Sequence, residues 1–435
     1  MINTEQSLLW YHLVMKPPST PTTTVAIETL GCKLNQAESE SLALQLVEMG
    51  YRLVSPSESA EIYILNTCTV THIADRKSRY LLRLARRRNP HATIIAIGCY
   101  ADRDAEEIDK LKCVDIILRN SEKENLPELI EGKRRQTSHG TCETDVLRTR
   151  SMIKIQEGCD HFCSYCIVPY VRGHERSLPS GEIIDEINSR VSMGFKEIVL
   201  TGTKIGSYHP SLELLIKLIL DRTDVQRIRL SSLQPKDITD GLLYLWNDAR
   251  LCRHLHLPLQ SGSDSVLKRM NRPYKTSDYE SAVKRIRKSI PQVAITTDII
   301  VGFPGETDAE FEESYRFCQH MSFANLHVFS YSEKPGTAAA AMPHQISETI
   351  KKERSKKMLK LARDSAAQFS RQFCGATMPV LWESEISSGV WDGLTDNYIR
   401  VMTHSSRSLK NEIINAKLSD TYNKSFKCIE ASLVP

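Results

Sequence analysis

The sequence lacks any long apolar segment. No apolar run in its 435 residues approaches the ~18 residues that would indicate a membrane span. The stretch from Met1 to Thr24 has one lysine and no hydrophobic region with a small-residue cleavage site, so it does not resemble a secretion signal. The composition, 41% hydrophobic and 25% charged, is typical of soluble globular proteins. We therefore expect a cytoplasmic protein of two or three domains without a membrane anchor.

A disulfide framework is also not expected, although the chain has 12 cysteines. Such frameworks belong mainly to small secreted domains, and this chain is neither small nor visibly secreted. A reducing compartment with metal-bound thiolates explains the cysteines better. Six of them show no ligand spacing and are interpreted as structural or incidental, namely Cys113, Cys142, Cys252, Cys318, Cys374 and Cys428.

Residues 24–136 are predicted to form an N-terminal domain around a doubly wound parallel sheet. Helix-like segments at about 35–49, 75–89, 103–111 and 122–131 alternate with apolar runs at Val25–Ile27, Ile62–Leu65, Thr93–Ile97 and Val114–Leu118. Asn35 and Glu38 have the spacing of a helix N-cap pair. Residues 1–23 are interpreted as a disordered extension or a misassigned start, and 133–150 as a polar linker.

A second α/β domain is predicted at 145–373. Helical segments such as Gly181–Ser192 and Asp308–Met321 separate six candidate strands, at Met152–Gln156, Glu197–Thr201, Arg227–Ser231, His254–Pro258, Ala294–Val301 and Asn325–Ser330. Six parallel strands suit a partial (β/α)6 barrel better than an eight-fold one. A basic amphipathic helix at 346–373 ends this domain. Residues 374–435 are predicted to form a small β-barrel, with Asp392-Gly393 as a turn between strands.

Three cysteines in the second domain follow its first strand directly. Cys159, Cys163 and Cys166, here called the loop triplet, have the spacing C-x-x-x-C-x-x-C. A compact loop of three thiolates can hold three corners of a four-iron cluster, and no fourth cysteine lies in the loop. Zinc would usually require a fourth ligand at suitable spacing. The pattern therefore favours a cluster with one open iron over a zinc site or inert thiols.

Three further cysteines recur at one place in the first domain. Cys32, Cys68 and Cys99, here called the strand triplet, each follow a predicted parallel strand. Because the carboxyl ends of parallel strands lie on one edge of a sheet, these residues can converge there. The alternative is three small hydrophobic residues at strand ends. Recurrence in three consecutive units favours a second cluster.

Basic residues are concentrated in short runs, although the net charge is only +4. Seven of them lie in one predicted helix, namely Arg76, Lys77, Arg79, Arg83, Arg86, Arg87 and Arg88. Further runs are Lys133–Arg135 and the lysines at 351, 352, 356 and 357. Such runs can bind phosphate backbones, and the alternative is a solvated helix face. Arg172 and Arg176, after the loop triplet, either contact RNA or pair with acidic neighbours.

The loop triplet resembles the signature of the radical S-adenosylmethionine (SAM) superfamily, with Tyr165 at the aromatic position. This resemblance implies a [4Fe-4S] cluster whose open iron binds SAM and, after one electron is added, yields a 5′-deoxyadenosyl radical. The segment from Ile299 to Glu306 resembles the superfamily strand near the adenine. Tyr165, Ser231, Gln260 and Asp298 are the candidate SAM contacts, although polar residues at strand ends are often ordinary hydrogen-bonding groups.

With both triplets, the chain resembles the methylthiotransferase family from about Thr24 to its end. The resemblance rests on the segments 30–36, 66–68, 158–173 and 392–401. It implies that the strand triplet ligates an auxiliary [4Fe-4S] cluster. It also implies that two SAM molecules are used in each turnover, and that the C-terminal barrel is an RNA-binding TRAM domain.

Within this family, the segments 31–35 and 158–166 are most similar to the branch that adds a methylthio group to carbon 2 of N6-threonylcarbamoyladenosine beside the tRNA anticodon. Other branches modify isopentenyladenosine in tRNA or a ribosomal-protein aspartate. A non-enzymatic RNA-binding iron–sulfur protein is a further alternative, which two three-cysteine sites disfavour. The implied partners are a tRNA anticodon stem-loop and an electron donor such as flavodoxin or ferredoxin.

Overall fold

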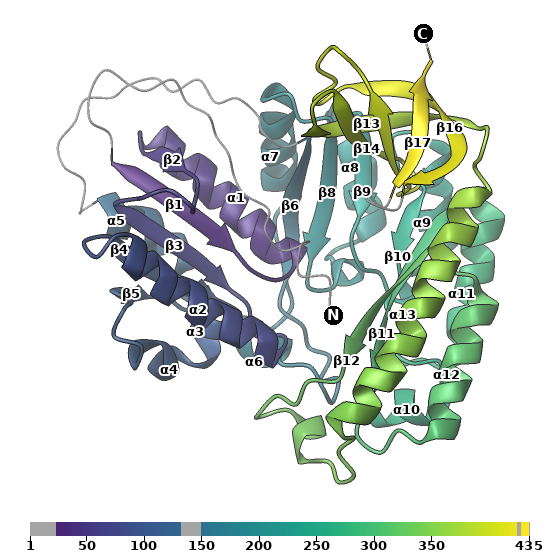
Figure 1. Ribbon diagram of the computed structural model, residues 1–435, viewed down its shortest axis with the longest axis horizontal. Helices are drawn as coiled ribbons and strands as arrows, with labels where there is room; N and C mark the ends of the chain where they lie inside the picture. The colour runs from purple at the N-terminus through teal and green to yellow at the C-terminus, as the bar shows by residue number, and fades with distance from the viewer. Residues whose placement is uncertain (1–22, 132–148, 424–427, 435) are drawn as a thin grey trace.

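The computed structural model describes residues 23–131, 149–423 and 428–434. Figure 1 shows three parts in sequence order: an α/β part, a larger α/β part and a small β-barrel. The predicted extension at 1–23 and the predicted linker at 133–150 fall almost wholly outside the described residues. Within the described ranges, no helix is long and apolar enough to cross a membrane.

The first part is built on a parallel sheet with strand order β2-β1-β3-β4-β5. Its strands are β1 (Thr24–Thr29), β2 (Arg52–Val54), β3 (Ile62–Thr67), β4 (Thr93–Gly98) and β5 (Ile116–Ile117). Its helices are α1 (Lys33–Glu48), α2 (His72–Arg88), α3 (Cys99–Arg103), α4 (Ala105–Asp109) and α5 (Leu126–Glu131). Two separate apolar clusters, one on each face of the sheet, form its core. The predicted parallel sheet is confirmed, with β2 as a strand that the sequence reading missed.

The predicted helix N-cap at Asn35 is wrong. Helix α1 already begins at Lys33, and Asn35 lies inside it. The Asn35 amide instead donates to the carbonyl oxygens of Leu30 (2.8 Å) and Thr67 (2.9 Å). Asn35 therefore ties the residue after β1 to the last residue of β3, which is a tertiary role that local spacing does not reveal.

The second part contains an open arc of parallel strands. One sheet has the order β7-β6-β8-β9 and the other β10-β11-β12, and parallel bridges from Ile228 to Leu251 and from Ser232 to His256 join them. The strands are β6 (Arg150–Glu157), β7 (Arg176–Ser177), β8 (Glu197–Gly202), β9 (Arg227–Leu230), β10 (His254–His256), β11 (Ala294–Val301) and β12 (Asn325–Ser330). All six predicted strands occur, and the short antiparallel β7 is an addition.

Helices cover the outer face of this arc (Figure 1). Alternate strand residues such as Ile153 and Ile155 pack with helix residues into one large apolar core. The intervening residues therefore face the inner side of the arc, here called the lumen. The helices are α6 (Val168–Arg172), α7 (Ser180–Ser192), α8 (Leu212–Arg222), α9 (Asp240–Tyr244), α10 (Asp264–Arg269), α11 (Thr276–Ser289), α12 (Asp308–Met321) and α13 (Glu348–Arg371).

The first two parts are joined by buried contacts. Ala37 of α1 packs on Met152 and Val199, which lie on the inner side of β6 and β8. The Lys334 ammonium group lies 2.6 Å from an oxygen of Asp75 at the start of α2, and both side chains are buried. Such pairs fix the orientation of the first part against the second, because leaving either charge buried alone would be costly.

The last part is a closed barrel with the strand order β13-β14-β15-β17-β16. Its strands are β13 (Thr377–Ser387), β14 (Val390–Thr395), β15 (Arg400–His404), β16 (Ile413–Asn423) and β17 (Cys428–Leu433). The predicted turn at Asp392-Gly393 is wrong, because both residues lie within β14. The turn lies at Gly389, and Gly393 is needed because a Cβ there would lie 2.8 Å from the Trp382 ring.

Candidate active site

The loop triplet lies immediately after β6, in a loop tied down by backbone hydrogen bonds. The amide of Cys159 donates to the Gly173 carbonyl (3.0 Å), and the amide of Cys166 donates to the Cys163 carbonyl (3.0 Å). Ser164 makes two hydrogen bonds to the carboxyl end of α10, from its amide to the Met270 carbonyl and from its hydroxyl to the Arg269 carbonyl. The fold therefore holds the three thiols in one compact loop, as the sequence predicts.

The electrostatic surroundings of these thiols suit a metal cluster. Burial, together with the neighbouring Cys163 and Cys159, raises the pKa of the Cys166 thiol to about 12. Arg272 donates a hydrogen bond to the Cys163 sulfur at 3.3 Å, which places a positive charge beside this thiol. A buried thiol is deprotonated mainly when a cation such as a metal ion binds its sulfur in place of the proton. A bound iron–sulfur cluster therefore fits this set of donors.

The candidate SAM residues lie toward the carboxyl ends of the parallel strands. Tyr165 packs beside Ile300 against a small apolar cluster that includes Phe303. Ser231 follows β9, and its hydroxyl is buried without a hydrogen-bond partner among the described residues. Gln260 has a φ of 71°, and its amide donates to the Asp298 carbonyl at 2.8 Å. The fold thus brings all four residues to the same end of the arc.

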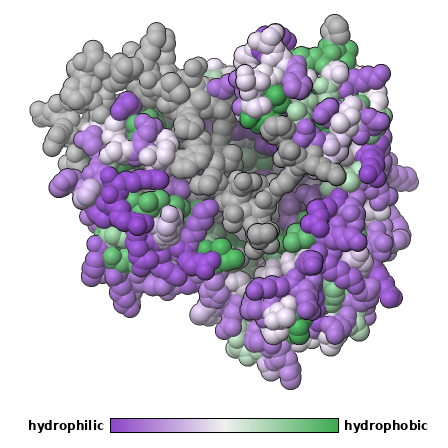
Figure 2. Space-filling model, viewed as in Figure 1, coloured by the Kyte–Doolittle hydropathy of each residue, from purple (hydrophilic) through white to green (hydrophobic). Residues whose placement is uncertain are grey.

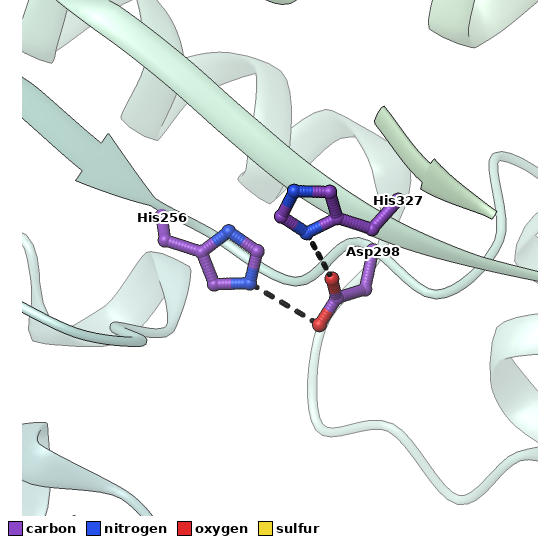
Figure 3. Close-up of side chains that lie close together, drawn as sticks. All are labelled: His256, Asp298 and His327. Atoms are coloured by element: carbon purple, nitrogen blue, oxygen red, sulfur yellow. Dashed lines mark hydrogen bonds and ion pairs between the residues drawn. The ribbon is translucent and has the colours of Figure 1, made fainter. Parts of the chain in front are cut away.

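Asp298 belongs to a cluster that sequence reasoning missed. One carboxylate oxygen lies 3.2 Å from Nε2 of His256, and the other lies 3.1 Å from Nδ1 of His327 (Figure 3). These three residues, here called the His–Asp–His cluster, come from the adjacent strands β10, β11 and β12. The sequence signal for this cluster was weak. It consisted of one polar, inward-facing residue on each of three strands that are far apart in the sequence.

The strand triplet lies just beyond the carboxyl ends of three adjacent strands. Cys32, Cys68 and Cys99 follow β1, β3 and β4, which are neighbours in the sheet. Gly31 has a φ of 97°, and a Cβ at this position would lie 2.7 Å from the Cys68 sulfur. Burial raises the pKa of Cys68 to about 12, with further contributions from Cys99 and Cys32. Cys68 therefore lies against the loop that carries Cys32 and near Cys99, as the predicted convergence of the three thiols requires.

The two triplets approach each other across the boundary between the first and second parts. Cys99 packs with Ile167, the residue directly after Cys166, and with Val171. Arg172 lies close enough to Cys99 for its positive charge to lower the thiol pKa, although burial raises that pKa overall. The structure thus places a member of the strand triplet against the segment that carries the loop triplet.

Arg172 and Arg176 differ in their surroundings. The Arg172 side chain is only 3% exposed, and its guanidinium group lies 2.7 Å from Glu38. This pairing lowers the pKa of Glu38 well below its usual range, although burial alone would raise it. Arg176 pairs with Glu157 but keeps a side chain that is 65% exposed. Arg172 therefore has an acidic partner on α1, which is one of the two predicted alternatives.

Helix α2 presents part of its basic run to solvent. Arg79 and Arg86 pair with Glu107 and Asp115. The exposed side chains of Arg76, Tyr80, Arg83 and Arg87, here called the α2 stripe, recur at helical spacing along one face. Figure 2 shows that the face over α2 is largely hydrophilic. The helix starts at the boundary with the second part, where the His72 amide donates to the Ser332 hydroxyl at 3.2 Å.

Known proteins match both α/β parts. The radical SAM superfamily matches residues 153–318, and "Uncharacterized protein family UPF0004" matches residues 24–119. The threonylcarbamoyladenosine tRNA methylthiotransferase MtaB of Bacillus subtilis is 37% identical over 91% of this chain and 93% of its own length. The protein of the same name from Thermotoga maritima is 39% identical over 87% of this chain and 90% of its own length.

A solved structure supports the fold. The radical SAM methyltransferase TsrM from Kitasatospora setae has a TM-score of 0.56 and 15% identity, and the match covers 74% of this chain and 77% of that one. It supports the mixed α/β radical SAM architecture alone. Together with the near full-length relatives, these matches show that the chain is a radical SAM enzyme and belongs to the methylthiotransferase family, of the MtaB type.

Proposed function

We propose that this enzyme adds a methylthio group to carbon 2 of N6-threonylcarbamoyladenosine beside the anticodon of tRNA. The observation that carries the proposal is the packing of Cys99 against Ile167, which brings the strand triplet next to the segment of the loop triplet. Relatives named for this activity match almost the whole chain. A product that needs both a radical and a sulfur atom requires two sites within reach of one substrate.

The six cysteines are the proposed ligands of two [4Fe-4S] clusters. Cys159, Cys163 and Cys166 would hold the first, and Cys32, Cys68 and Cys99 the second. When bound, the clusters and two SAM molecules supply one-electron cleavage of SAM and a methylated sulfur for transfer. An electron donor such as flavodoxin or ferredoxin would reduce the first site.

The residues of the chain would position the reactants and exclude water. Arg272 would orient the Cys163 sulfur through its hydrogen bond. The unpartnered Ser231 hydroxyl and the Gln260 side chain are proposed SAM contacts, and Tyr165 would close the cluster loop beside them. Asp298 lies at the same end, but its carboxylate oxygens are engaged by histidines. Asp298 would therefore line the SAM site rather than offer a free carboxylate.

Three domains are proposed, with 24–136 as the auxiliary-cluster domain, 145–373 as the radical SAM domain and 374–435 as an RNA-binding TRAM domain. The barrel packs against the amino ends of the parallel strands. Arg150, which begins β6, lies 2.6 Å from Glu383, and the Arg253 guanidinium lies 2.6 Å from Asp396. RNA contacts of the barrel would thus fall away from the target base, toward the anticodon stem.

The α2 stripe is the proposed second RNA contact. Its three arginines have no ion pair within the described residues, and Tyr80 between them is 54% exposed. Because α2 starts beside Ser332 at the boundary of the two α/β parts, a backbone bound along it would lead toward the cysteines. Arginine and an exposed aromatic ring are suited to phosphates and unstacked bases.

Anaerobic turnover of a defined RNA tests the proposal. The reconstituted enzyme, with reductant and SAM, should convert an anticodon stem-loop carrying N6-threonylcarbamoyladenosine, and mass spectrometry of its nucleosides should show the methylthio product. Stem-loops with isopentenyladenosine, and ribosomal protein, serve as alternative substrates. Methylthiolation of one of those in place of the threonylcarbamoyl RNA would reject the proposed substrate. Failure to cleave SAM would reject the radical mechanism.

A further inference from the structure

The His–Asp–His cluster faces the lumen, beside the predicted SAM site. Asp298 and Ile300 are two residues apart on β11, so they share a face, and Ile300 packs against the same small apolar cluster as Tyr165 of the cysteine loop. Two residues of strand span roughly 7 Å. The His–Asp–His cluster therefore lies two residues further from the carboxyl end of β11 than Ile300.

The hydrogen bonds of the cluster determine where its protons lie. The Asp298 carboxylate only accepts, so Nε2 of His256 and Nδ1 of His327 each carry a hydrogen that points at it. Nδ1 of His256 then accepts from the Thr296 hydroxyl at 2.9 Å. That hydroxyl has no second hydrogen, so the His254 ring donates to it at 3.0 Å. The hydrogen bonds thus run without a break from Nε2 of His254 to the Asp298 carboxylate.

Within the described residues, two ring nitrogens of this chain have no hydrogen-bond partner, Nδ1 of His254 and Nε2 of His327. The His254 nitrogen is buried, whereas the His327 side chain is 43% exposed. The Asp298 carboxylate behind it fixes the orientation of the ring through its hydrogen bond with Nδ1. The fold thus presents one oriented imidazole edge to the lumen, able to accept a hydrogen bond or, when protonated, to donate one.

Phe329 lies two residues further along β12, on the same face as His327. Phe329 is 44% exposed, whereas Leu326 and Val328, which alternate with His327 and Phe329 along the strand, pack into the apolar core. An exposed aromatic ring beside an oriented imidazole can stack on a base while the imidazole contacts its substituent. These two side chains provide both kinds of contact that an unstacked nucleotide needs.

We propose that His327, held by Asp298 and His256, recognises the polar N6 substituent of the target adenosine, with Phe329 stacking on the base. This inference rests on the proposed function. The threonylcarbamoyl group offers amide and carboxylate atoms to Nε2 of His327. An isopentenyl group offers none, and it would strip water from the polar cluster without replacing those hydrogen bonds. The cluster therefore favours the polar substituent over the apolar one.

Anaerobic kinetics with three stem-loops test this assignment. They share one sequence and carry N6-threonylcarbamoyladenosine, N6-isopentenyladenosine or adenosine at the target position. The measured quantity is the ratio of kcat/KM, and of binding affinity with SAM present, for the threonylcarbamoyl RNA over the other two. His327→Phe and Asp298→Asn should lower both ratios by about tenfold to a hundredfold, the effect of losing one charge-assisted hydrogen bond. His320→Ala, on exposed α12, is the matched control.

The outcomes separate this inference from the proposed function. If wild-type enzyme prefers the isopentenyl RNA, the proposed substrate and this inference both fail. If it prefers the threonylcarbamoyl RNA but His327→Phe and the gentler His327→Gln keep the wild-type ratios, only this inference fails. Zinc or manganese held stoichiometrically by the wild type and lost in His327→Ala, with RNA selectivity unchanged, would overturn it in favour of a metal site. The iron content of each variant reports whether it folds around its clusters.

Discussion

The two cysteine triplets reach a similar arrangement by different routes. The loop triplet lies within eight consecutive residues, from Cys159 to Cys166, and is held by the backbone bonds of one loop. The strand triplet spans Cys32 to Cys99 and converges only because β1, β3 and β4 are neighbours in the sheet. The first site therefore depends on local chain geometry, and the second depends on the whole first part being folded.

The largest expected effect separates the roles of the triplets. Cys163→Ala should abolish both SAM cleavage and RNA methylthiolation, because the proposed open-iron site would lose one of its three ligands. The measurement is 5′-deoxyadenosine and methylthiolated nucleoside in one anaerobic assay. Cys318→Ala, a buried cysteine outside both triplets, serves as the control. SAM cleavage at the wild-type rate by Cys163→Ala would contradict the assignment of the loop triplet.

The next effect concerns how the second part orients the first. Lys334→Ala should lower the free energy of unfolding by up to about 3 kcal/mol, because buried Asp75 loses its closest cation and keeps only the Arg103 guanidinium, 3.5 Å away. Denaturant titration of the anaerobic protein measures this. Lys112→Ala removes an exposed pair with Asp109 and should have no measurable effect. Equal stability of the two variants would mean that the buried pair does not couple the parts.

Substitution of two glycines tests whether the loop triplet and the strand triplet form independently of each other. Gly31→Ala places a Cβ 2.7 Å from the Cys68 sulfur at a positive φ, which costs about 1–3 kcal/mol and displaces the strand triplet. Gly158→Ala places a Cβ 1.8 Å from the His174 carbonyl oxygen, beside the loop triplet. Iron content and SAM cleavage should show that the first variant keeps the radical site and the second loses it. The same defect in both variants would contradict two separately built sites.

The smallest expected effect lies on the α2 stripe. Arg83→Glu should weaken tRNA binding several-fold and reduce its salt dependence by about one released counterion, because one phosphate contact is lost. Lys288→Glu, on exposed α11, makes the same charge change on the outer wall of the second part. Binding measured at several salt concentrations distinguishes them. Equal weakening by both variants would indicate a general charge effect and not a contact along α2.

Features that depend on hydrophobic periodicity or on short, compact motifs could be predicted from the sequence. The parallel strands, the long helices and the C-terminal barrel were expected, and the structure contains them. Errors arose where tertiary contacts override local signals: Asn35 bonds to Leu30 and Thr67 rather than capping a helix, and Gly393 makes room for Trp382 rather than forming a turn. The His–Asp–His cluster was missed because β10, β11 and β12 bring its members together only in the folded arc.

The most direct test of the central claim is the Cys32→Ala, Cys68→Ala, Cys99→Ala variant in an anaerobic assay with threonylcarbamoyl RNA. Both 5′-deoxyadenosine and the methylthiolated nucleoside are quantified beside wild type. Two sites with separate roles predict that this variant still cleaves SAM but forms no methylthiolated nucleoside. Methylthiolation by this variant, or loss of SAM cleavage in a variant that retains the loop-triplet cluster, would contradict that division.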